Sequence, residues 1–298
     1  MNSPETGVAQ NGKTRIFFSV SGSSVDEPVL FLNGLGSQLI NFLPGWVEEF
    51  RTAGFFVIRM DNRDVGLSSK TEGEPPSMEE LVALWSNGHS PSALVAPYQF
   101  RDMAQDCIAV LDALNIEKVH VWGMSMGGMI AQTLAINHSH RLRSMTSVMS
   151  TTGELGVGTA TSESAAQLIP DRGKREDVIR SAVEGRGVHS GPLFDISKAR
   201  ELEAAAYDRC HHPDGKVWQM FALLSSGSRA NQLRTVSIPS MVIHGRVDSL
   251  VQLDGGEATA DLIPGAELVV YDDMGHDIPE PLWKNYRADL ERLVERTR

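Results

Sequence analysis

The sequence predicts an α/β fold: a mostly parallel central sheet flanked by helices, with a helical cap inserted late in the sheet. Short apolar runs, typical of strands buried on both faces, alternate with longer amphipathic segments typical of helices. This alternation stops near residue 150, and only helical patterns follow until it resumes near residue 240. We therefore expect a core formed by residues 1–150 and 235–298 and a helical cap formed by residues 151–234.

The first half of the chain contains most of the predicted strands. Residues 1–13 are polar and are expected to be a loose lead-in, and the loop at residues 22–28 could close a hairpin. Residues 70–97 are broken by prolines, so we expect a surface excursion with one short helical patch. Strands are predicted at residues 14–20, 29–32, 55–60, 119–122 and 142–149, and helices at residues 46–53 and 98–114.

The second half begins with the predicted cap. Cap helices are expected at residues 175–184, 197–210 and 215–225, and the sheet resumes with strands at residues 240–245 and 267–271 and helices at residues 256–262 and 283–295. Strands that alternate with helices favour a parallel sheet with right-handed crossovers. An insert between two such strands is expected to cover the C-terminal edge of the sheet.

Composition excludes several classes of protein. The chain has 298 residues and a formal net charge of −11, which argues against nucleic acid as a partner. No apolar run reaches the length of a transmembrane helix and the N-terminus lacks a signal-peptide pattern, so we expect a cytoplasmic protein with no membrane partner. Cys107 and Cys210 are expected to be free thiols. The oligomeric state is left open.

The motif that organises the chain is Gly-x-Ser-x-Gly at residues 123–127, between a β-branched run and an apolar helical pattern. A strand that turns into a helix this sharply leaves no room for side chains beside Ser125, which explains Gly123 and Gly127. This nucleophile elbow lifts a serine hydroxyl above the C-terminal edge of the sheet, at a helix N-terminus that favours a developing anion. Ser125 is therefore the predicted nucleophile.

Two later loops supply partners for this serine. A serine hydroxyl needs a base at neutral pH, and an imidazole base needs a carboxylate to orient it. Asp248 follows the predicted strand at 240–245, and His276 follows the strand at 267–271. Because ligands bind at the C-terminal ends of parallel strands, Ser125, Asp248 and His276 are expected to form a catalytic triad.

Other acids and histidines in the sequence are alternatives to the members of this triad. Asp254, Asp272 and Asp273 are rival acids, of which Asp254 is the strongest because it shares a loop with Asp248. His244 lies within a strand and is expected to be packed. His211 and His212 are adjacent and would point in different directions on a helix, so no metal site is predicted.

An acyl-transfer reaction also needs two donors for its oxyanion. The backbone N–H of Met126, just after the nucleophile, is the first. The second is expected from the Gly-rich turn after the strand at 29–32, with Leu35 as the donor.

Taken together, these stretches resemble the α/β-hydrolase superfamily over nearly the whole chain. The matching stretches are residues 32–36, 61–68, 123–127, 242–248 and 274–276. Within the superfamily the chain is similar to bacterial capped serine esterases, and to aclacinomycin methylesterases around the elbow and the last two strands. Many relatives have His-Gly at Asn33-Gly34. The loop containing Arg63 and Asp64 resembles a structural turn.

The resemblance implies a carboxylic-ester hydrolase that needs no cofactor and acts on a small-molecule ester, with an apolar pocket supplied by the cap. Trp218 and Phe221 are the cap residues expected to bind the substrate. Ser125 excludes the members that use an aspartate nucleophile. Carbon–carbon bond hydrolysis, thioester hydrolysis and haloperoxidase-like chemistry remain open on the same triad, as does a binding protein without turnover.

Overall fold

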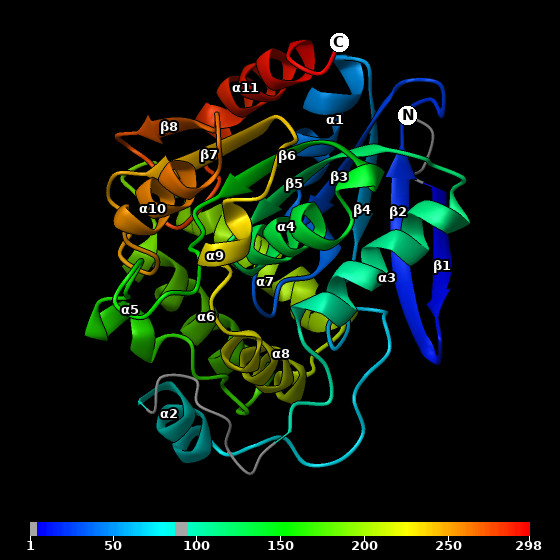
Figure 1. Ribbon diagram of the computed structural model, residues 1–298. Coiled ribbons are helices and arrows are strands. Elements are labelled where there is room, and N and C mark those ends of the chain that lie inside the picture. The colour runs from blue at the N-terminus through cyan, green and yellow to red at the C-terminus, as the bar shows by residue number, and fades with distance from the viewer. Residues whose placement is uncertain (1–4, 87–94) are drawn as a thin grey trace.

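The computed structural model describes residues 5–86 and 95–298, which form an eight-stranded sheet in the order β1-β2-β4-β3-β5-β6-β7-β8 (Figure 1). β1 and β2 pair antiparallel, β2 pairs antiparallel with β4, and all other neighbours are parallel. The mostly parallel α/β fold predicted from the sequence is confirmed. The strands are β1 Glu5–Asn11, β2 Thr14–Ser21, β3 Glu27–Leu32, β4 Phe55–Met60, β5 Val119–Met124, β6 Leu142–Val148, β7 Ser240–Gly245 and β8 Glu267–Tyr271.

The N-terminal segment differs from its prediction, because residues 5–11 form strand β1 rather than a loose lead-in. β1 is an edge strand in which only Ala9 is buried, so it lacks the apolar signal of an inner strand. The hairpin joins β1 to β2 through Gly12, whose φ is 57°. The two loop residues are Gly12 and Lys13, and a glycine with positive φ at the first of them suits the primed turns of two-residue hairpins. The loop at 22–26 instead leads from β2 to β3, which are not neighbours in the sheet.

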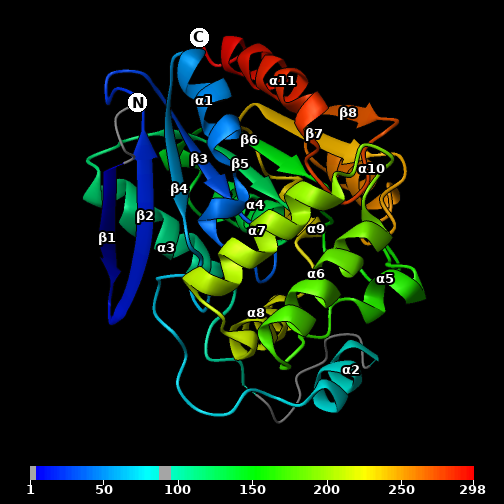
Figure 2. The same ribbon diagram turned by 180° about the vertical axis from the view of Figure 1, so that it is seen from behind.

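Two apolar layers cover the two faces of the sheet. On one face, Leu30 and Leu32 of β3 pack with α3 Phe100–Ala113 and α4 Met126–Asn137. On the other, Val29 and Phe31 pack with α1 Pro44–Thr52 and the C-terminal helix α11 Trp283–Glu295. The alternation along β3 explains why this strand reads as one continuous apolar run. α1 and α11 lie side by side in both views (Figures 1 and 2).

The helices between β6 and β7 gather beside the C-terminal edge of the sheet (Figure 2). They are α5 Ser162–Ala166, α6 Arg175–His189, α7 Ile196–Arg209, α8 Pro213–Ser226 and α9 Ala230–Leu233. α5 and α9 were not anticipated, because each is too short to show helical periodicity. α9 packs against α4 and α10 Asp254–Leu262, so the last helix before β7 contacts the layer beside the sheet.

The proline-rich excursion contributes more than a surface loop. Its helix α2, Met78–Ser86, packs against α8, with Leu81 and Leu84 buried there. Both views place α2 beyond α8, far from the sheet (Figures 1 and 2). The rest of this predicted excursion includes residues 87–94, which lie outside the described residues. Within the described part of the chain, no helix is long and apolar enough to cross a membrane. Cys107 and Cys210 are free thiols.

Candidate active site

Ser125 lies at the turn between β5 and α4, with a φ of 54° that non-glycine residues rarely adopt. The residues two positions before and after it, Gly123 and Gly127, must be glycines. A Cβ added to Gly123 would lie 2.1 Å from the carbonyl oxygen of Gly127, and one added to Gly127 would lie 2.3 Å from that of Leu32. The Ser125 N–H donates to the Val148 carbonyl at 2.8 Å, which holds the strained turn against β6.

Replacing Gly127 with alanine is expected to lower the free energy of unfolding by about 2–3 kcal/mol, because the new methyl group meets rigid backbone. Thermal and urea unfolding measure this loss. Gly187→Ala is the matched control, because a Cβ there meets only the Phe194 ring at 3.5 Å within helix α6. A loss of stability equal in the two variants would contradict the steric argument.

The three predicted triad residues lie in one hydrogen-bonded chain. His276 Nε2 is 2.9 Å from Ser125 Oγ, and His276 Nδ1 is 2.7 Å from Asp248 Oδ2. The other carboxylate oxygen of Asp248 accepts the N–H groups of Leu250 and Val251, both at 2.9 Å. Because Nδ1 faces a carboxylate it carries the proton, which leaves Nε2 free to accept the serine proton.

Among the described residues, none of the rivals makes a hydrogen bond or an ion pair with His276. Asp254 accepts the Gly158 N–H at 3.2 Å, and Asp272 pairs with Arg246 at the surface. His244 is fully buried, and burial lowers its pKa. Its Nε2 is 2.8 Å from the Val251 carbonyl, so His244 is a packed neutral residue, as predicted.

The end of α6 holds the loop that carries His276. The His276 N–H donates to the His189 carbonyl at 2.6 Å, and the two imidazole rings meet edge to face at 5.8 Å. Burial and the neighbouring His276 lower the pKa of His189 to about 3, so its ring is neutral. This contact could not be predicted, because residues at the end of α6 carry no sequence signal for a partner 87 positions away.

Gly275 permits this close approach: a Cβ there would lie 2.4 Å from the Gly191 nitrogen. We therefore expect Gly275→Ala to push the His276 loop away from Ser125 and to lower kcat by about 100-fold, the effect of a misplacement near 1 Å. Steady-state kinetics, read beside the unfolding temperature, test this. Unchanged kcat in a folded Gly275→Ala protein would mean that the cap contact does not position His276.

The residues of the two predicted oxyanion donors, Leu35 and Met126, line the same cavity as Ser125. Among the described residues, neither the Leu35 N–H nor the Met126 N–H has a hydrogen-bond acceptor. The Gly34 loop passes beside the nucleophile, since a Cβ on Gly34 would lie 3.2 Å from Ser125 Cβ. Gln219 of α8 fixes this loop by accepting the Gly36 N–H at 2.8 Å. Both free N–H groups can therefore face a bound carbonyl.

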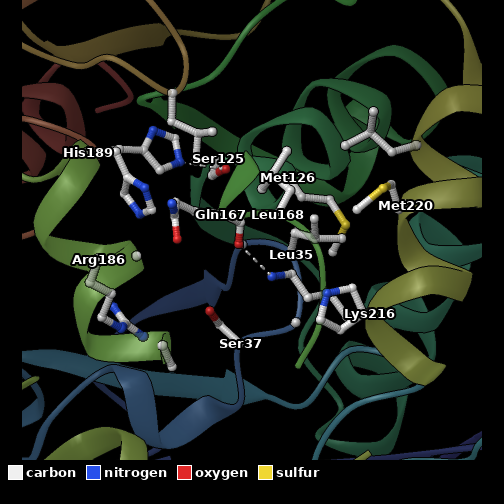
Figure 3. A pocket seen from close by; sticks show the side chains of 18 of the residues that line it. Leu35, Ser37, Ser125, Met126, Gln167, Leu168, Arg186, His189, Lys216 and Met220 are labelled. Carbon is white, nitrogen blue, oxygen red and sulfur yellow. Dashed lines mark hydrogen bonds between the residues drawn. The ribbon is translucent and has the colours of Figure 1, made fainter. Parts of the chain in front are cut away.

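Ser125 and His276 open onto a cavity of about 640 Å³ between the sheet edge and the inserted helices (Figure 3). A volume of this order is typical of pockets for drug-sized ligands. Much of its wall is apolar. These side chains include Met126, Met129, Met149, Leu168, Met220, Leu223, Leu224 and Val251, together with Met78, Leu81 and Val82 from α2.

The prediction that Trp218 and Phe221 bind substrate is wrong, because neither side chain lines the cavity. Both are buried in the apolar layer that includes α2 and α3. α8 presents Lys216, Met220 and Leu223 to the cavity instead. These positions recur at helical spacing on the opposite stripe of α8. The sequence identified the right helix but could not tell its two faces apart, since both carry large apolar residues.

Two other sequence expectations concern residues outside the cavity. Arg63 pairs with Asp106 at 2.6 Å, and Asp64 accepts the Thr71 hydroxyl, so their loop is a structural turn as predicted. Asn33 is fully buried and its carbonyl accepts the Asn62 side chain at 3.2 Å.

Within the described residues, no group of three or more His, Cys, Asp or Glu side chains is arranged so that it could bind a metal ion. His211 stacks on Tyr207 with ring centroids 4.3 Å apart, rather than pairing with His212.

Comparison with known proteins gives a consistent family. The chain is 28% identical over 293 residues to rhodomycin D methylesterase DauP of Streptomyces sp. (strain C5), covering 88% of this chain and 90% of the relative. It is 26% identical to rhodomycin D methylesterase DnrP of Streptomyces peucetius, covering 93% and 95%. An esterase from Exiguobacterium antarcticum superposes with a TM-score of 0.75 at 18% identity, covering 97% of this chain and 98% of that one, which shows the shared fold.

The sequence profile of the alpha/beta hydrolase fold matches residues 27–280, which is most of the chain. The match spans β3 to β8 and includes the elbow and both later loops. It agrees with the resemblance found in the sequence motifs. The chain therefore belongs to the alpha/beta hydrolase fold family.

Proposed function

We propose that this protein is a serine hydrolase that cleaves carboxylic esters through an acyl-enzyme intermediate. The observation that carries the proposal is the hydrogen-bonded chain from Ser125 Oγ through His276 to Asp248, which opens onto a cavity with two free backbone donors. Serine, imidazole and carboxylate in this order perform acyl transfer on several unrelated folds.

In the first half of the reaction, Ser125 Oγ attacks the ester carbonyl carbon as its proton passes to His276 Nε2. The carbonyl oxygen takes up the negative charge and accepts the Leu35 and Met126 N–H groups. The bond from carbon to the leaving oxygen then breaks, and His276 gives its proton to that oxygen. The alcohol leaves, and the acyl group remains on Ser125.

In the second half, a water molecule attacks the acyl carbon and gives a proton to His276. The bond to Ser125 Oγ breaks, the serine recovers its proton from His276, and a carboxylic acid is released. Asp248 stays ionised throughout and stabilises the imidazolium that forms twice in each cycle.

We further propose that residues 151–234 act as a cap whose inner wall selects bulky esters. The Met- and Leu-rich wall of the cavity and its volume support this proposal. Sequence similarity to methylesterases over nearly the whole chain favours an ester of a large acid with a small alcohol. The family membership does not by itself choose between an ester and another bond cleaved on the same residues.

A fluorophosphonate probe and a substrate panel test the proposal together. The expected result is labelling of Ser125, located by peptide mass spectrometry, together with turnover of p-nitrophenyl butyrate and of aromatic methyl esters. The panel also contains a diketone that reports carbon–carbon cleavage. Labelling with turnover of the diketone alone would replace the ester proposal with carbon–carbon hydrolysis. A folded protein that neither labels nor turns over any substrate would contradict a catalytic role.

A further inference from the structure

Two cations that line the cavity, Lys216 and Arg229, have no carboxylate partner among the described residues. Arg229 donates to one side-chain and two backbone oxygens, whereas the ammonium group of Lys216 is largely unpaired. Lys216, on the inner face of α8, directs its ammonium group into the space shared with Ser125 (Figure 3). Its one recorded contact is the Gln167 carbonyl, at 3.4 Å. No carboxylate of the described residues lies within 4.0 Å of Lys216 Nζ. An ammonium group has three donors, so two are without a protein acceptor.

The other charged groups around Lys216 do not neutralise it. Glu203 and Arg186 are the charges close enough to affect its pKa. Glu203 is already paired with Arg186, whose guanidinium also donates to Asn41 at 2.9 Å. Farther along the cavity wall, Glu154 accepts from Thr152 and Asp277 accepts the Gly275 N–H. The Arg186–Glu203 pair has no net charge, so Lys216 adds a positive charge to the polar end of the cavity.

The position of Lys216 relative to the nucleophile follows from the loop at residues 34–36. A Cβ on Gly34 would lie 3.2 Å from Ser125 Cβ, and one on Gly36 would lie 3.2 Å from Lys216 Cγ. Two residues of chain span at most about 7 Å. The ammonium group therefore lies within reach of a group carried several bonds away from an ester bound at Ser125.

We propose that Lys216 binds a carboxylate on the substrate, so that the preferred substrate is a half-ester or another ester acid with its acid group several bonds from the scissile bond. This inference rests on the proposed ester hydrolysis and names its substrate class. A substrate carboxylate would accept from the two unpaired N–H donors of Lys216 and would supply the negative charge that balances its ammonium group. The neighbouring apolar wall would hold the carbon skeleton between the two groups.

The test compares matched substrates. Phenyl half-esters of adipic and suberic acid are set beside the corresponding amide-terminated and methyl-terminated phenyl esters. A charged hydrogen bond contributes more than a neutral one, so we expect kcat/KM for the acid to exceed that for the amide by about 10-fold or more. Lys216→Met should abolish this preference, so that the acid and the amide are turned over with similar kcat/KM. Lys216→Arg should restore part of it, and Lys284→Met on α11 is the surface control.

The pH dependence of the preference is a second readout. Burial lowers the pKa of Lys216 to about 8, so the ammonium is charged at pH 7 and is lost as the pH rises through 8. The ratio of acid to amide turnover should fall over that range in the wild-type protein and stay flat in Lys216→Met. Any effect of pH on the chemical step is common to both substrates and cancels in the ratio.

Binding to Ser125→Ala, measured by calorimetry, separates this inference from the proposed reaction. Tighter binding of the half-ester than of the amide-terminated ester, lost on adding Lys216→Met, would support the carboxylate site even if no ester were turned over. Equal binding and equal turnover of acid and amide in the wild-type protein would overturn the inference and leave the ester hydrolase proposal intact. A preference that persists in Lys216→Met would also overturn it.

Discussion

Ser125→Ala is expected to lower kcat by about 10⁵-fold or more on any ester the protein cleaves, because no other group can form the acyl-enzyme. The hydroxyl makes one recorded hydrogen bond, to His276, and alanine fits without new contacts. The substitution retains the positive φ of 54°, which alanine tolerates no better than serine. We therefore expect the unfolding temperature to change little. Burst and steady-state kinetics measure the first effect, and thermal unfolding measures the second.

The control for this variant is Ser139→Ala, the same change at an exposed residue beyond α4. It should keep full activity and full labelling by the fluorophosphonate probe on Ser125. Ester turnover by Ser125→Ala within ten-fold of the wild-type rate would remove Ser125 from the mechanism. Loss of folded protein in Ser125→Ala would make the kinetic result uninformative, so far-UV circular dichroism accompanies every assay.

Much of the fold could be predicted because its inner strands are buried on both faces. β3, β4, β5 and β7 read as short continuous apolar runs, and their order along the chain implies a parallel sheet. The edge strand β1 could not be recognised by the same criterion, since its side chains are mostly exposed. The glycine at the first loop position, Gly12, is the better signal, because turn chemistry does not depend on burial.

The candidate site was predictable to the extent that chain topology brings residues together. Parallel strands end at one edge, so residues just after β5, β7 and β8 must lie near one another. Residues of the helices inserted between β6 and β7 have no such constraint. Trp218 and Lys216 are two positions apart on α8, and the packing of α2 and α3 against that helix decides which of them lines the cavity. The contact between His189 and His276 depends on packing in the same way.

Asp248→Asn is expected to lower kcat by about 10⁴-fold while leaving the protein folded, as loss of the orienting carboxylate does in other triads. The geometry dictates how the new amide is oriented. Its oxygen must stay where Oδ1 is, because that atom accepts the N–H groups of Leu250 and Val251. The NH₂ group then faces His276 Nδ1, which must become an acceptor. The proton moves to Nε2, and Nε2 can no longer take the proton of Ser125.

The rival acids provide matched controls for this result. Asp254→Asn at the start of α10 and Asp272→Asn in the turn after β8 make the same chemical change, but these carboxylates pair with Gly158 and Arg246 rather than with His276. Both variants should keep kcat within about three-fold of the wild-type value, the range expected for surface changes near half a kcal/mol. The rate at which the fluorophosphonate probe labels Ser125 should fall in Asp248→Asn and stay at the wild-type value in the two control variants. A large loss of kcat in Asp254→Asn, with kcat retained in Asp248→Asn, would assign the orienting role to Asp254. The reason is that the carboxylate that holds the proton on His276 Nδ1 leaves Nε2 free to accept the proton of Ser125.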